Sequence, residues 1–175
     1  LYWGADDVWL LDGGFPAWRK ERSRPVESGK ARHAAPGSFV LDVRPGRRIE
    51  TRELKVAVDA AGASLLDART PAEFAGETVA GQKRGGHLPG ARLVPAKSLY
   101  AADGRYVGAD ELQRLAGLGP PGSKGARDRP ITYCTGGVRS ALLAVLLEAR
   151  LGVAAANCDG SLWEWSAEPS LPLVK

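Results

Sequence analysis

Short apolar runs and helix-like patterns take turns along residues 39–175. Runs rich in Val, Leu and Ile are typical of buried strands, whereas apolar positions three or four residues apart indicate helices. The expected strands are 64–67, 91–95, 130–133 and 153–158, and the expected helices are 52–61, 70–74, 109–118 and 140–151. This alternation predicts an α/β fold with a mainly parallel sheet and helices on both faces.

Local signals support the expected helix ends. Thr51 is a candidate cap for the first helix, Thr70 followed by Pro71 is typical of a helix start, and Gly152 is typical of a helix end. In a parallel α/β sheet, ligands bind beyond the carboxyl ends of the strands. Asp67 is the last residue of one expected strand and Cys134 directly follows another, so both are candidates for a site at that edge.

Two segments of the chain resemble each other. Residues 12–18 read Asp-Gly-Gly-Phe-Pro-Ala-Trp, and residues 159–165 read Asp-Gly-Ser-Leu-Trp-Glu-Trp. Chance similarity is the alternative to a repeat of about one domain length. On the repeat interpretation, residues 1–29 are the C-terminal remnant of a preceding domain, 30–38 a linker and 39–175 the catalytic domain. The sequence has no Met, which favours a fragment or processed chain.

The strongest chemical signal is the segment Cys134-Thr135-Gly136-Gly137-Val138-Arg139 between an expected strand and an expected helix. The two glycines allow positive φ, so backbone N–H groups can point inward. Together with the helix dipole, such a loop lowers a thiol pKa and makes the thiolate a nucleophile. Arg139 adds a permanent positive charge for an anionic substrate. Cys158 has no such surroundings and is expected to be inert core packing.

Four segments together resemble the rhodanese family. They occur in the order found in the family: the Asp-x-Arg…Glu-Phe-x-Gly segment at 67–76, Gly-His-Leu-Pro-Gly-Ala at 86–91, the cysteine loop at 134–139 and the closing Asp-Gly-Ser segment at 159–165. The resemblance is to the C-terminal, catalytic half of tandem-domain thiosulfate or 3-mercaptopyruvate sulfurtransferases. It implies a rhodanese-like fold with a central parallel five-stranded sheet.

The resemblance also implies an activity and roles for residues. Cys134 takes a sulfane sulfur as a persulfide and passes it to cyanide, a thiol or a protein acceptor. Arg69 and Arg139, with Thr135, Gly136, Gly137 and Val138 of the loop, are expected to bind the small anionic donor. Asp67 is expected to orient neighbouring groups, although capping of a loop is its alternative, and His87 is expected to be structural. The missing preceding rhodanese domain is an expected partner.

Other functions give different patterns. Phosphatases of this fold carry five residues between Cys and Arg, whereas here four separate Cys134 from Arg139. Non-catalytic rhodanese-like modules typically lose the cysteine, although a sulfur carrier that serves one protein partner stays open, as does a redox-sensing thiol. Arg139 favours thiosulfate as donor, but Thr135 stands where thiosulfate enzymes often have Arg. The 3-mercaptopyruvate alternative therefore remains.

The composition limits the classes of binding partner that are expected. The net charge of +4 comes from scattered residues without a basic stripe, which argues against nucleic-acid binding. No stretch approaches the ~18 apolar residues of a membrane span. Two cysteines and two histidines form no metal-ligand pattern, so neither metal nor cofactor is expected. A cytoplasmic location is expected, with the periplasm left open because the N-terminus of the full protein is expected to be missing from this sequence.

Overall fold

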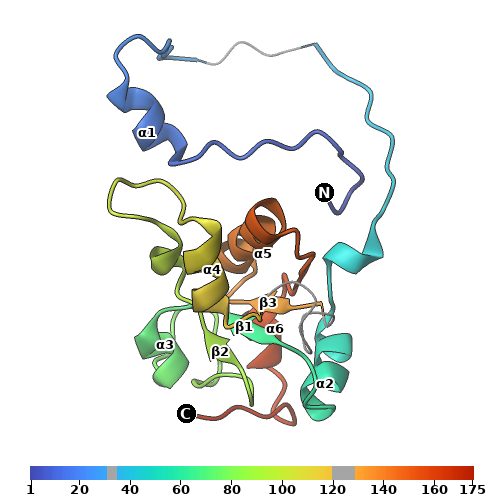
Figure 1. The fold of residues 1–175 in the computed structure, drawn as a ribbon. Helices are drawn as coiled ribbons and strands as arrows, with labels where there is room; N and C mark the ends of the chain where they lie inside the picture. The colour runs from blue at the N-terminus through green and yellow to red at the C-terminus, as the bar shows by residue number, and fades with distance from the viewer. Residues whose placement is uncertain (31–34, 120–128) are drawn as a thin grey trace.

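A parallel sheet forms the centre of the computed structural model, which describes residues 1–30, 35–119 and 129–175. The strands of this described part are β1 (Leu65–Asp67), β2 (Arg92–Leu93), β3 (Ile131–Tyr133) and β4 (Ala156–Asn157). Their order is β2-β1-β3-β4, and every pairing is parallel. Figure 1 shows the sheet across the middle of the main body. The parallel α/β architecture expected from the sequence is confirmed.

The sheet has four strands in the described residues, where five were expected. The outer edge of β4 holds a single parallel bridge between Arg48 and Asn157, with the Ile49 amide donating to the Asn157 carbonyl at 3.1 Å. A 3-10 helix, η1 (Pro45–Arg47), ends immediately before this bridge, and α2 (Thr51–Asp59) begins soon after it. Too few residues are left between these helices for a strand, so pairing stops at the bridge.

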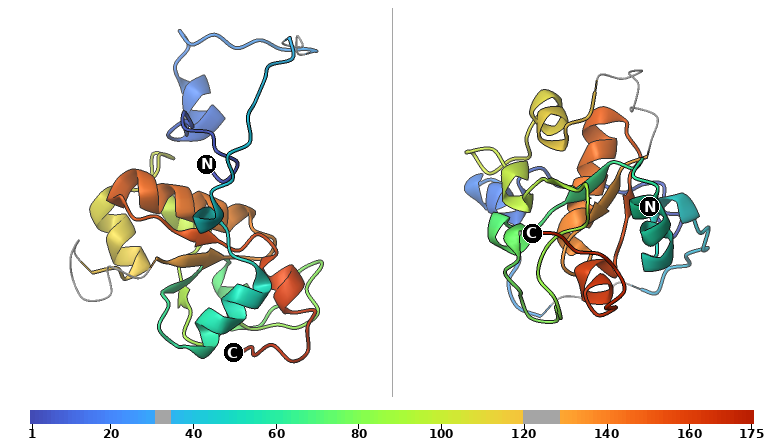
Figure 2. Two further views of the ribbon diagram at one scale, coloured as in Figure 1. Left: turned by 90° about the vertical axis from the view of Figure 1, so that its right-hand side faces the viewer. Right: turned by 90° about the horizontal axis from the view of Figure 1, so that it is seen from below.

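Helices cover both faces of the sheet (Figure 2). On one face α2 and α6 (Ser161–Trp165) contribute Leu54, Val58, Leu162 and Trp165 to one apolar cluster. On the other face α4 (Ala109–Ala116) and α5 (Val138–Leu151) build a second cluster around Leu112, Leu143, Leu146 and Leu147. Successive residues of a strand point to opposite faces, so Leu65 joins the first cluster and Leu66 the second.

Capping residues explain where the helices begin. Glu50, not the expected Thr51, caps α2 in a reciprocal capping box with Glu53. Thr70 caps α3 (Pro71–Ala75) as expected, and its hydroxyl accepts from the Glu73 amide while Glu73 reaches back to the Thr70 amide. The remaining helix of the main body is the 3-10 turn η2 (Ala96–Leu99), beside the end of β2.

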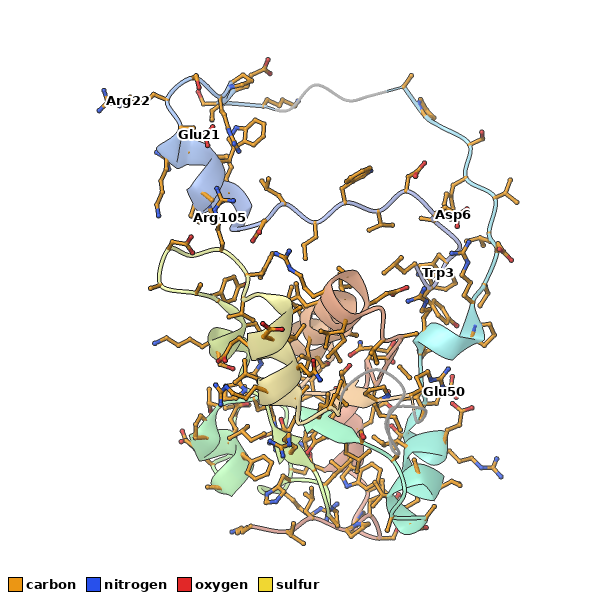
Figure 3. All side chains as sticks on the ribbon, in the orientation of Figure 1. Trp3, Asp6, Glu21, Arg22, Glu50 and Arg105 are labelled. Carbon is orange, nitrogen blue, oxygen red and sulfur yellow. The ribbon has the colours of Figure 1, made fainter. Side chains whose placement is uncertain are left out.

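The N-terminal segment runs outside the main body (Figure 1). Its helix α1 (Gly14–Lys20) has no buried residue, and Trp9 is 91% exposed. The segment touches the body at a few points, among them Asp12 with Arg150 at 3.0 Å. Figure 3 shows Trp3 and Asp6 where the segment passes beside the chain that leads into η1. Such sparse contacts fit the expectation that residues 1–29 belong with a preceding domain, which stays a prediction.

The two similar segments also share structural details. Helix α1 starts at Gly14 and α6 at Ser161, 147 positions apart, and both starting residues have positive φ, +59° and +46°. The indole of Trp18 donates to the Pro25 carbonyl at 3.0 Å, and 147 positions later that of Trp165 donates to the Pro172 carbonyl at 2.9 Å. A positive φ at the first helical residue and a hydrogen bond from a Trp indole to the carbonyl seven residues later therefore occur twice, although the preceding glycines differ, with Gly13 at φ +81° and Gly160 at φ −65°. The two shared details favour the repeat interpretation, which stays a prediction.

Candidate active site

Cys134 lies directly after β3, at the carboxyl end of the sheet, and is 2% exposed. Its backbone is held by the start of α6. The Cys134 amide donates to the Ser161 hydroxyl at 3.0 Å, and the Cys134 carbonyl accepts from the Leu162 amide at 3.2 Å. The next carbonyl, that of Thr135, accepts from the Trp163 amide at 2.9 Å. Helix α6 thus clamps the loop through three hydrogen bonds.

The sulfur of Cys134 sits among hydrogen-bond donors at the head of α5. Burial by itself raises the pKa of this thiol. The Ser140 hydroxyl and the backbone amides of Ser140, Gly136 and Arg139 lower it by more, so the net pKa of Cys134 is below its ordinary value. The amides and the N-terminus of α5 form the anion-stabilising loop expected from the sequence.

The two glycines of the loop are required by close packing. Gly137 has φ +82°, and a Cβ there would lie 2.6 Å from the backbone of Asp159. A Cβ on Gly136 would lie 2.4 Å from the indole of Trp163. Helix α5 starts directly after Gly137, two residues before the expected 140, because the left-handed turn at Gly137 already leads into the helix. Val138 is 81% exposed.

Glu73 is part of the site, although the sequence did not single it out. Its carboxylate forms a bidentate pair with Arg139, with both N–O distances at 2.8 Å, and accepts from the Thr135 hydroxyl at 2.8 Å. These bonds, the Arg139 pair first, lower the pKa of Glu73 to about 2 although burial opposes them. Thr135 and Arg139 are therefore held by an acid from α3. The Thr70-x-x-Glu73 capping box was a sequence signal for its helix role, but not for this contact.

Arg69 lies deeper than expected. The side chain has no exposed surface and pairs with the equally buried Asp67, with Nη2 2.6 Å from Oδ2. Its remaining donors reach the carbonyls of Glu73 and Gly86 at 3.2 and 2.8 Å. The guanidinium is occupied by protein acceptors, although Arg69 is among the residues that line the cavity beside the loop. Its direct contact with a donor stays a prediction. Asp67 holds the Arg69 guanidinium, and its Oδ1 also accepts from the Arg69 amide at 2.9 Å, so the contacts fit both the orienting role and the loop cap considered from the sequence.

Cys158 and His87 are structural in this geometry. Burial raises the pKa of Cys158 to about 11, so this thiol stays protonated. The ring of His87 stacks on Phe74 with centroids 3.5 Å apart, and Nδ1 lies 2.8 Å from the Phe74 carbonyl oxygen. The ring is thus engaged within a turn, where the sequence placed it.

A cavity of about 510 Å³ opens beside the loop. It is lined by Arg139, by 68–71 at the end of β1, and by 95–98 with the basic Lys97. Within the part of the chain that the structure describes, none of the lining residues is acidic. A small anion could therefore be held here beside the cysteine loop.

A family model matches the part of the chain that contains the strand-end cysteine, its six-residue loop and the helix N-terminus. The model described as Rhodanese-like domain matches residues 50–168. The chain belongs to the rhodanese family. The match lies inside the expected catalytic domain, and the C-terminal segment 159–165 falls within it.

Rhodanese relatives carry several names. The chain is 34% identical over 97% of its length to the "Putative thiosulfate sulfurtransferase SseB" of Mycobacterium tuberculosis and covers 58% of that protein. It is 30% identical over 99% of its length to both a "Probable 3-mercaptopyruvate sulfurtransferase" of Pseudomonas aeruginosa and the "Sulfur carrier protein TtuD" of Thermus thermophilus, covering 61% and 64% of them. The chain thus spans about three fifths of these relatives.

Solved structures share the rhodanese fold. YnjE is 25% identical with a TM-score of 0.84, over 99% of this chain and 44% of that one. EanB in complex with ergothioneine is 20% identical with a TM-score of 0.83, over 98% of this chain and 42% of that one. In the part of the chain that the structure describes, no helix is long and apolar enough to cross a membrane. Nor do its His, Cys, Asp and Glu side chains gather into a potential metal site.

Proposed function

We propose that this chain is a sulfurtransferase domain that moves a sulfane sulfur from an anionic donor to a thiophilic acceptor through a persulfide on Cys134. The observation that carries the proposal is the thiol environment. The sulfur lies among three amides and a hydroxyl at the start of α5, which favour its thiolate. A thiolate is the form that attacks a sulfane sulfur.

The transfer takes two displacement steps. The Cys134 thiolate attacks the outer sulfur of thiosulfate, an S–S bond forms to Cys134, and the old S–S bond breaks with its electron pair leaving on sulfite. A cyanide or thiolate acceptor then attacks the outer sulfur of the persulfide. The bond to Cys134 breaks, and its electron pair returns to the Cys134 sulfur. No external oxidant or reductant is needed.

Thiosulfate is the donor that we propose, with 3-mercaptopyruvate as the alternative. The cavity beside the loop is lined by Lys97 and by Arg139, whose charge is shared with Glu73, and none of the described residues that line it is acidic. This lining suits a small anion. Relatives with both donor names match the chain, so the names do not decide between the donors. The relative named a sulfur carrier makes a protein acceptor a second candidate for the discharge step. We place the domain after a preceding rhodanese-like domain in a cytoplasmic protein.

The residue after Arg139 also argues against phosphatase chemistry. The arginine of a wider phosphatase loop would stand at Ser140, and here the Ser140 hydroxyl lies 3.5 Å from the Cys134 sulfur. That position therefore contributes to a thiolate site and carries no guanidinium for phosphate.

Mass spectrometry tests the proposal directly. After incubation with thiosulfate, the intact protein should gain one sulfur, and peptide mapping should place it on Cys134. Cys134→Ser should abolish both the added sulfur and thiocyanate formation, whereas the matched Cys158→Ser should retain them. Sulfur on Cys158, or thiocyanate formed without Cys134, would contradict the proposal. A donor panel with cyanide as acceptor then ranks thiosulfate against 3-mercaptopyruvate.

A further inference from the structure

Ser140 places a hydroxyl between two acceptors in the first turn of α5. Its side chain is fully buried, and its Oγ lies 3.5 Å from the Cys134 sulfur and 3.0 Å from the Gly137 carbonyl oxygen. A serine hydroxyl has one proton to donate. It can therefore serve either the sulfur or the carbonyl at a given moment, while its lone pairs can accept from a protonated thiol.

Arg139, the cationic residue of the loop, is already paired with a carboxylate. Arg139 forms a bidentate pair with Glu73 on α3, so its charge near the sulfur is offset by a carboxylate. At the end of β1, the charges of Asp67 and Arg69 likewise offset each other in a buried pair. Cys158, after β4, is uncharged because burial raises its pKa. The Ser140 hydroxyl lies 3.5 Å from the Cys134 sulfur, and the paired guanidinium of Arg139 also interacts with this sulfur.

We infer that Ser140 is a catalytic residue whose hydroxyl changes acceptor with the charge of Cys134. When Cys134 is a thiol, the Ser140 proton points to the Gly137 carbonyl. When Cys134 is a thiolate, the proton points to the sulfur and stabilises its charge. This inference deepens the proposed function, on which its catalytic meaning rests.

The hydroxyl acts in both displacement steps. Before loading, it raises the fraction of Cys134 that is thiolate at neutral pH. During discharge, the bond between Cys134 and the outer sulfur breaks and its electron pair returns to the Cys134 sulfur. The Ser140 proton can turn toward that sulfur as the negative charge forms, which makes Cys134 a better leaving group.

Replacing Ser140 by Ala should give a diagnostic pH profile. Loss of a hydrogen bond to a charged group should raise the Cys134 pKa by about one unit or more, so about tenfold less thiolate is present below the pKa. The remaining thiolate is intrinsically more nucleophilic, by about threefold at a Brønsted coefficient of about 0.4–0.5. Alkylation should therefore be about threefold slower than wild type at low pH and about threefold faster on the alkaline plateau. The two profiles should cross.

The experiment is iodoacetamide alkylation of Cys134 from low to high pH in a Cys158→Ser background, with the ultraviolet absorbance of the thiolate as a second titration. Ser140→Thr keeps the hydroxyl, so the pH midpoint of its alkylation profile should equal that of the wild type. Ser166→Ala is the matched control: Ser166 is equally buried, and its hydroxyl accepts from the Lys83 amide, away from the sulfur. Its midpoint should not move.

Three results would overturn the inference. They are an unchanged midpoint in Ser140→Ala, a uniform loss of rate at every pH, or the same raised midpoint in Ser140→Thr as in Ser140→Ala. If Ser140→Ala does not fold, which circular dichroism shows, Ser140→Gly removes the same hydroxyl, and its pH midpoint against that of Ser140→Thr decides. Alkylation requires no sulfur donor, so this test can succeed or fail independently of persulfide formation on Cys134.

Discussion

Ser161 combines a strained backbone with a hydrogen bond to the catalytic residue. Its φ is +46°, which an L-residue rarely adopts, and the residue 147 positions earlier is Gly14 at φ +59°. The Ser161 hydroxyl accepts from the Cys134 amide at 3.0 Å and donates to the Cys158 carbonyl. We predict that the hydroxyl holds the cysteine loop in its reactive position, and that the strain is the cost of placing it there.

The magnitudes follow from these two contributions. Positive φ in a non-Gly residue costs about 1–2 kcal/mol, and a buried amide left without an acceptor costs about 1–3 kcal/mol. Ser161→Ala loses the hydrogen bond and keeps the strain, so its free energy of unfolding should fall by about 1–3 kcal/mol. Ser161→Gly loses the same bond but relieves the strain, so it should be about 1 kcal/mol more stable than Ser161→Ala. Both variants should load sulfur more slowly than wild type.

The assay pairs urea unfolding with the rate of thiocyanate formation from thiosulfate and cyanide. Ala61 provides the control, because it is the other non-Gly residue with positive φ, +49°, among the described residues and lies exposed after α2. Ala61→Gly should raise stability without changing the rate. The reasoning is refuted if Ser161→Gly transfers sulfur at the wild-type rate, or if Ser161→Ala and Ser161→Gly are equally stable.

The other predictions concern the ion pairs and the N-terminal segment. The pKa of Glu73 is lowered to about 2, so its carboxylate stabilises the fold fully above about pH 4.5 and progressively less as the pH falls toward 2. Glu73→Gln should flatten this acid-side loss of stability, measured by urea unfolding at several pH values; an unchanged acid profile would contradict the pairing with Arg139. Arg69→Ala should lower stability by about 3–5 kcal/mol because it leaves a buried carboxylate unpaired. If it instead raises only the Michaelis constant for thiosulfate, with stability intact, Arg69 does contact the donor. Removal of residues 1–38 should leave a cooperatively folded domain with less self-association, measured by thermal unfolding and sedimentation; an unfolded product would mean that the segment belongs to this domain's core.

The reactive loop could be predicted because its signals are local. A strand, a cysteine, two glycines and a helix follow one another within 131–151, and each depends on neighbours a few residues away. The closing segment at 159–165 was visible in the same way, as a repeated pattern with a turn residue and a Trp at fixed positions. The fold class followed from alternation of elements, which also acts over short distances.

Contacts between distant segments were decided by the tertiary structure. Glu73 meets Arg139 and Thr135 because β1 pairs with β3, which brings α3, after one strand, beside the loop after the other. Ser161 reaches Cys134 for a similar reason, since β4 lies next to β3 and feeds α6 over the loop. The sequence alone placed Arg69 near the site, but burial of its guanidinium depends on acceptors from three segments that meet only after folding. The local sequence pattern thus determined which residue is the nucleophile. The order of strands in the sheet determined which side chains surround it, because packing, and not neighbouring residues, sets hydrogen-bond partners that are far apart in sequence.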